Sequence, residues 1–154
     1  MIDIKPSESI AACNLLLQES NAIYHAAATK AGVSDCAFQI LYMLQDAAVP
    51  CQQSEIAESA SLPPQSVNSA LKKLEQKGLV TLSGTSRRAG KKITLTESGE
   101  AFVEKHITPV RRAENEVVSS FSEEEIETFM RLFETLVKRL NRGIGEAIQE
   151  GEAT

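Results

Sequence analysis

The pattern of apolar and polar residues predicts a succession of helices interrupted by one short β-hairpin. Apolar side chains recur at the three- and four-residue spacing of amphipathic helices over most of the chain. The helices are expected at about 7–30, 35–47, 52–59, 64–76, 97–119 and 123–148. Residues 79–83 and 92–96 instead alternate apolar and polar side chains, as strands do. The expected fold class is therefore mainly α with a small antiparallel β-hairpin, and Pro109 predicts a kink in its helix.

Residues that cap helices mark several of these boundaries. Ser34, Thr96 and Ser122 each precede an expected helix and carry a hydroxyl that can accept from a free backbone N–H group. Ser122 and Glu125 form the S-x-x-E pattern of a capping box. Gly78 suits the left-handed residue that ends a helix.

The helix expected at 64–76 has one apolar face and one polar face. Its polar face carries Gln65, Asn68, Ser69, Lys72 and Gln76. The major groove of B-DNA accepts a helix and presents base edges that amide and hydroxyl groups can read. We expect Gln65, Asn68 and Ser69 to read bases, while lysines suit phosphates. By itself, the pattern fits a solvated amphipathic helix equally well.

Basic residues concentrate around this helix and in the hairpin that follows. Residues 51–96 hold seven Lys or Arg against three Glu, whereas the segments on either side are both net acidic. Arg87 and Arg88 lie at the expected hairpin tip, and arginine favours narrow, electronegative minor grooves. A helix for one groove and a basic loop for the next predict a DNA-binding surface. Its expected members are Gln65, Ser66, Asn68, Ser69, Lys72, Lys73, Arg87, Arg88 and Lys91.

Length and composition indicate an ordinary globular protein. The 154 residues are 42% hydrophobic and 24% charged, which predicts one domain spanning 1–154. No apolar run approaches the roughly 20 residues of a membrane-spanning helix. The first residues carry acids and no basic leader, unlike a signal peptide. The three cysteines lack paired spacing, which favours a reducing compartment over a disulfide scaffold. We therefore expect a cytoplasmic protein, and one that does not contact membranes.

The sequence gives little sign of catalytic or metal chemistry. His25 and His106 lie on separate expected helices, and neither belongs to an HxxxH or CxxC pattern. Cys13, Cys36 and Cys51 are scattered, so a zinc site would require all these residues to converge in the fold. No Ser/His/Asp set, carboxylate pair or glycine-rich phosphate loop stands out. We expect no enzyme activity, no cofactor and no bound metal.

Two stretches of the central segment carry a family resemblance. The first has the form LxxLExxGLV and is made of Leu71, Leu74, Glu75, Gly78, Leu79 and Val80. The second is Leu95-Thr96-Glu97-Ser98-Gly99, which follows the basic hairpin. With these stretches the chain resembles the MarR family of bacterial transcription regulators over most of its length. It departs at Ser86. In the family the hairpin is called the wing, and it often carries an Asp at this place that helps hold the wing arginine.

The resemblance implies an obligate homodimer. It places a winged helix-turn-helix at 34–96 and dimerisation helices at 1–31 and 97–148. The sequence supports this, because apolar side chains recur every three or four residues along the last helix. The alternative is that both flanking segments pack within one chain. The expected interface residues are Ile10, Leu17, Ile126, Phe129, Phe133, Leu140 and Ile144. A two-fold dimer would match a pseudo-palindromic operator with half-sites about 10 bp apart.

The resemblance also implies a signal that releases the protein from DNA. A small amphipathic effector, often an aromatic acid, would bind where the dimer helices meet the winged domain. By position, the candidates are His25, Phe38, Tyr42 and His106. Phe38 and Tyr42 fit a hydrophobic core equally well, because residues four apart on a helix pack together.

A cysteine is the other candidate sensor, since some MarR-like proteins detect peroxide through a cysteine in their first helices. Cys36 lies in the first turn of its expected helix, where the helix dipole would lower the pKa of the thiol. The apolar surroundings of Cys13 favour an inert buried thiol, and all three cysteines being structural is the simpler interpretation.

Together these features predict a homodimeric, sequence-specific DNA-binding regulator, expected to be a repressor that a small molecule or another signal releases from its operator. Two alternatives remain. One is a winged helix used for protein interaction, with the basic hairpin meeting an acidic partner. The other is a regulator that senses redox conditions through a cysteine.

Overall fold

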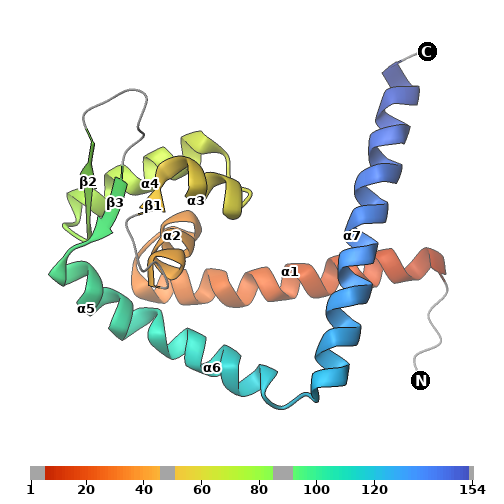
Figure 1. Cartoon of the computed structure of the whole chain (residues 1–154), viewed down its shortest axis with the longest axis horizontal. Helices are drawn as coiled ribbons and strands as arrows, with labels where there is room; N and C mark the ends of the chain where they lie inside the picture. The colour runs from red at the N-terminus through yellow and green to blue at the C-terminus, as the bar shows by residue number, and fades with distance from the viewer. Residues whose placement is uncertain (1–5, 46–50, 85–91, 153–154) are drawn as a thin grey trace. The chain divides into compact units, whose positions relative to one another are not determined.

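A computed structural model describes residues 6–45, 51–84 and 92–152 of the chain (Figure 1). The chain divides into two compact units, Met1–Arg111 and Arg112–Thr154. In chain order the elements are α1 (Pro6–Ala31), α2 (Asp35–Gln45), β1 (Cys51–Gln52), α3 (Gln53–Ser59), α4 (Pro64–Gln76), β2 (Val80–Ser83), β3 (Lys92–Leu95), α5 (Glu97–His106), α6 (Thr108–Val118) and α7 (Glu123–Glu152). The predicted fold class, mainly α with a small antiparallel sheet, is confirmed.

The predicted helix caps are present. The Ser34 hydroxyl accepts from the Ala37 backbone N–H at 3.3 Å, and the Thr96 hydroxyl accepts from the Gly99 N–H at 3.0 Å. At the start of α7 the Ser122 backbone N–H donates to the Glu125 carboxylate at 2.8 Å. The same contact lowers the pKa of the Glu125 carboxyl, because the hydrogen bonds stabilise its charged form. These contacts fix where α2, α5 and α7 begin.

The sheet contains one strand that the sequence did not predict. Strands β2 and β3 pair antiparallel, with Val80 opposite Leu95 and Ser83 opposite Lys92. The two-residue strand β1 pairs with the other edge of β3, with Cys51 opposite Ile93, which gives the order β1-β3-β2. Two residues are too few to show a periodicity, so the sequence does not predict this strand. The helix expected at 52–59 begins at Gln53 in the structure, one residue later.

The core of the first unit lies between α2, α4, the sheet and α5. Figure 1 shows α2, α3, α4 and the strands grouped near the C-terminal end of α1. The largest fully buried side chains are Ile40, Leu41, Ile56, Leu71, Leu74, Ile93, Ile107, Val67 and Val80. Every element from α2 to α5 except β1 contributes at least one buried residue. The apolar face of α4 is thereby anchored, and its polar face is left at the surface.

The helix expected at 97–119 is two helices in the structure. Helix α5 ends at His106, Ile107 is its C-cap, and α6 begins at Thr108. Pro109 has no N–H group, and its ring conflicts with the carbonyl four residues earlier, so a continuous helix is unfavourable there. Ile107 itself is fully buried, which fixes the break against the core.

Both α1 and α7 expose much apolar surface. On α1, Leu15, Leu16 and Ile23 are each more than 60% exposed. On α7, Phe129 is 62% exposed and Ile144 is 56% exposed. An exposed apolar surface of this extent is typical of a face that a partner covers. Within the residues that the structure describes, no helix is long and apolar enough to span a bilayer.

Candidate nucleic-acid interface

The turn between α3 and α4 sets the direction of α4. Ser61 has a positive φ of 50°, and the Leu62 backbone N–H donates to the Ala57 carbonyl at 2.9 Å, which ends α3. Pro63, the N-cap of α4, has a non-helical backbone conformation, so α4 begins after it. Pro64 occupies the first turn, where its missing N–H group is not needed. The two helices therefore form a helix-turn-helix whose second member is α4.

Helix α4 presents most of the predicted DNA-binding side chains to solvent. Its buried face consists of Val67, Ala70, Leu71 and Leu74. The exposed residues among those predicted are Gln65, Ser66, Ser69, Lys72 and Lys73. Asn68 is half-buried, so less of its amide is available than the sequence suggested. The structure thus brings Gln65, Ser69 and Lys72 together on one helix face.

The hairpin is described only where its strands pair. Lys92 is exposed at the start of β3, opposite Ser83 on one side and Gln52 on the other. The connection from β2 to β3 carries Ser86, Arg87, Arg88 and Lys91, which lie outside the described residues. Their predicted role at the wing is therefore a proposal that rests on the sequence.

The four candidate effector residues take part in separate contacts. Phe38 is 3% exposed and belongs to the core, as the alternative interpretation held. The guanidinium of Arg111 lies 4.1 Å from the centre of the Tyr42 ring and donates to the Tyr42 carbonyl at 3.0 Å. His106 packs against Phe102 with ring centres 4.5 Å apart. Partial burial, Lys105 and Lys30 lower the pKa of His106.

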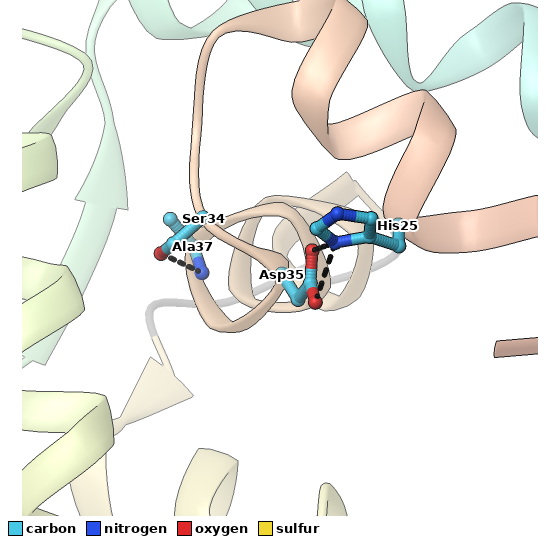
Figure 2. A network of polar contacts seen from close by, with 4 residues as sticks. All are labelled: His25, Ser34, Asp35 and Ala37. Atoms are coloured by element: carbon cyan, nitrogen blue, oxygen red, sulfur yellow. Dashed lines mark hydrogen bonds and ion pairs between the residues drawn. The ribbon is translucent and has the colours of Figure 1, made fainter. Parts of the chain in front are cut away.

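His25, the fourth candidate, links α1 to the start of α2. Its Nδ1 atom lies 2.9 and 3.0 Å from the two carboxylate oxygens of Asp35, and both side chains are about two-thirds exposed. Figure 2 shows this pair beside the Ser34 cap of the same helix. The contact is exposed to solvent, so its contribution to stability is small.

The cysteine expectation is wrong in one respect. Cys36 is the second residue of α2, near the helix N-terminus as predicted. Burial nevertheless raises the pKa of its thiol, the opposite direction to the one expected from the helix dipole. Cys13, Cys36 and Cys51 are all half-buried. Among the described residues, no group of three or more His, Cys, Asp or Glu is placed to hold a metal ion.

The predicted dimer residues lie where a second chain can reach them. Ile10, Leu17, Phe129, Leu140 and Ile144 are exposed. Ile126 and Phe133 are half-buried, and the Phe133 ring stacks with Phe129 at 5.7 Å between centres. Each of these residues belongs to α1 or α7, which carry most of the exposed large apolar side chains among the described residues.

The helix-turn-helix, with a hairpin directly after its second helix, defines the chain as a winged helix-turn-helix protein. Residues 31–89 match the MarR family. The matched stretch spans α2 to β2, so the likeness to this family lies in the helix-turn-helix.

Solved structures have the same fold over almost the whole chain. A MarR family regulator from Neisseria meningitidis matches with a TM-score of 0.76 at 20% identity, covering 90% of this chain and 97% of that one. The S. aureus MepR–DNA complex matches with a TM-score of 0.68 at 22% identity, covering 90% and 99%. Staphylococcus aureus MarR with salicylate and kanamycin matches with a TM-score of 0.68 at 16% identity, covering 88% and 92%. The chain therefore has the MarR-type fold from α1 to α7.

Proposed function

We propose that this protein is a homodimeric, sequence-specific DNA-binding transcription regulator. The observation that carries the proposal is the solvent-facing surface of α4, where Gln65, Ser69 and Lys72 share one face while the opposite face is anchored in the core. Amide and hydroxyl groups on such a face match the hydrogen-bonding groups of base edges, and lysines match phosphates. Support also comes from MepR, a protein of the same fold that was solved bound to DNA.

In this proposal Gln65, Ser66, Asn68 and Ser69 contact bases, and Lys72 and Lys73 contact phosphates. Arg87, Arg88 and Lys91 contact the neighbouring minor groove from the hairpin connection. The net charge of +4 over residues 51–96, within a chain of net charge −5, favours binding of DNA at this segment over the rest of the surface.

Fluorescence anisotropy with the DNA upstream of the gene tests the proposal. Gln65→Ala removes a proposed base contact and should weaken binding about 5- to 150-fold, since a good bidentate base contact contributes about 1–3 kcal/mol. Gln39→Ala is the matched control, because Gln39 is also an exposed helical glutamine but lies on α2. Binding that is unaffected by Gln65→Ala, or equally affected by both changes, would contradict the proposal.

We extend the proposal to a dimer formed through the apolar faces of α1 and α7. Phe129→Glu places a charge on the exposed face of α7 and should convert the dimer to monomer in sedimentation experiments, with loss of DNA binding. Glu127→Gln is the control, because Glu127 is exposed on the same helix and its change adds no charge. A monomeric wild-type protein that binds operator DNA would refute this part.

The regulatory part of the proposal is repression relieved by a small amphipathic molecule. Its support is the Staphylococcus aureus MarR, which has the same fold and was solved with salicylate and kanamycin. In this chain Tyr42 and His106 are half-buried and His25 is exposed, whereas Phe38 belongs to the core. Isothermal titration with salicylate tests this, and Tyr42→Ala should reduce any affinity that it reveals.

A further inference from the structure

The C-terminal end of α4 is bonded to two other helices of the first unit. Lys77, the C-cap of α4, extends its side chain to the turn directly after α1, where Nζ donates to the Gly32 carbonyl at 2.7 Å. The Thr96 hydroxyl, at the start of α5, donates to the Gly78 carbonyl at 2.6 Å. The Thr96 backbone N–H donates to the Leu79 carbonyl at 3.1 Å. Three consecutive residues after α4 therefore connect it to α1 and to α5.

The two helix ends joined by Lys77 have the same geometry. At the end of α1, Gly32 has a φ of +71°, and the Val33 N–H donates to the Ala28 carbonyl at 3.1 Å. At the end of α4, Gly78 also has a φ of +71°, and the Leu79 N–H donates to the Leu74 carbonyl at 3.0 Å. Both ends are Schellman caps, which are well-defined turns. The Lys77–Gly32 bond thus joins two ordered backbone segments.

A lysine suits this position for an electrostatic reason. The C-terminal end of a helix carries a partial negative charge, because its last carbonyl groups have no partner within the helix. The Lys77 ammonium beside the end of α1 therefore interacts with that charge as well as with the Gly32 oxygen. The bond is exposed, so its contribution is modest, yet it acts between elements 45 residues apart in the chain.

We infer that Lys77 is a positioning residue, which ties the DNA-reading helix α4 to α1, rather than a phosphate-binding residue. The inference rests on the proposed function, because α1 carries part of the proposed dimer interface and α4 the proposed base contacts. Because the bond links them, the distance between the two α4 helices of the dimer depends on the position of α1 in each protomer. Lys77 then sets how strictly the protein selects the distance between operator half-sites.

Lys77 differs from its basic neighbours in where its side chain lies. Lys72 and Lys73 lie within α4 and are exposed. A lysine that binds a phosphate releases counterions, so its removal lowers the slope of log K against log salt by about 0.9. Removal of a positioning lysine lowers affinity without changing that slope.

The test compares Lys77→Met, Lys77→Arg and Lys72→Met on duplexes that differ only in half-site spacing, at several salt concentrations. Lys77→Met should weaken binding about threefold to tenfold at the best spacing, as expected for loss of one modest hydrogen bond. It should also reduce the preference for that spacing and leave the salt slope unchanged. Lys77→Arg, which can still donate to Gly32, should restore the preference. Lys72→Met should lower the salt slope and keep the preference.

A second measurement does not depend on DNA. In the free protein, Lys77→Met should accelerate amide hydrogen exchange at Val33 and Leu79, the residues that close the two caps, and Lys72→Met should not. Unchanged exchange at both amides, or a reduced salt slope for Lys77→Met, would overturn the inference while leaving the proposed DNA binding intact. Failure of the wild type to bind DNA would overturn the proposed function. Amide hydrogen exchange would still show whether the Lys77–Gly32 bond links α4 to α1.

Discussion

Gly99 in the first turn of α5 packs directly against the carbonyl oxygen of Leu79, so closely that a Cβ atom at position 99 would overlap it. The obstacle is backbone rather than a flexible side chain, and the Leu95 side chain crowds the same position. The Leu79 oxygen also accepts from the Thr96 backbone N–H at 3.1 Å, so it is held in place. Glycine at position 99 therefore allows α5 to approach the end of α4.

Gly99→Ala should destabilise the protein by about 1–3 kcal/mol, the usual effect of overpacking. Alanine favours helices over glycine by about 1 kcal/mol, but here the steric overlap outweighs that gain. Gly143→Ala is the matched control, because a Cβ at this helical position of α7 meets nothing within 4 Å. Urea denaturation should show a loss for the first change and none for the second, and equal effects would contradict the packing argument.

Thr96→Val should lower the free energy of unfolding by about 0.5–2 kcal/mol, the range found for lost N-caps. Valine keeps the branched shape but removes both hydroxyl contacts, the one from the Gly99 N–H and the one to the Gly78 carbonyl. Thr94→Val provides the comparison, since Thr94 is exposed in the middle of β3. Chemical denaturation measures both, and a Thr96→Val protein as stable as Thr94→Val would refute the capping role.

Stability should fall as the pH drops through 6.5, in part because of His106. Partial burial, followed by Lys105 and Lys30, lowers the pKa of His106 from its ordinary value of 6.5. Just below pH 6.5 the unfolded chain therefore binds this proton while the folded protein does not, which favours unfolding. The loss ends once the pH is below the folded-state pKa. His106→Gln should show a shallower decline in thermal denaturation at a series of pH values, and parallel curves would contradict the assignment.

The caps at Ser34, Thr96 and Ser122 were predictable because each depends on residues within three positions along the chain. The buried face of α4 followed from periodicity for the same reason. Strand β1 was not predictable, since Cys51 pairs with Ile93 far along the chain. The Lys77–Gly32 bond is equally non-local, and in the sequence Lys77 looked like one more basic residue of the DNA-binding segment.

Burial depends on tertiary packing in the same way, and it accounts for two further differences. The half-burial of Asn68 is set by what packs beside α4, which periodicity alone does not give. The pKa of Cys36 was expected to fall at a helix N-terminus, but desolvation raises it. A helix position is local information, whereas the surroundings of that position come from the whole fold.

Selection of binding sites from a randomised pool of duplex DNA tests the central claim most directly. A homodimer with two copies of α4 should enrich a pseudo-palindromic sequence with half-sites about one helical turn, ~10 bp, apart. Affinity for the enriched sequence should fall steeply with salt, and Gln65→Ala should relax the preference within each half-site. Recovery of no common sequence, or binding that is insensitive to salt, would contradict the account.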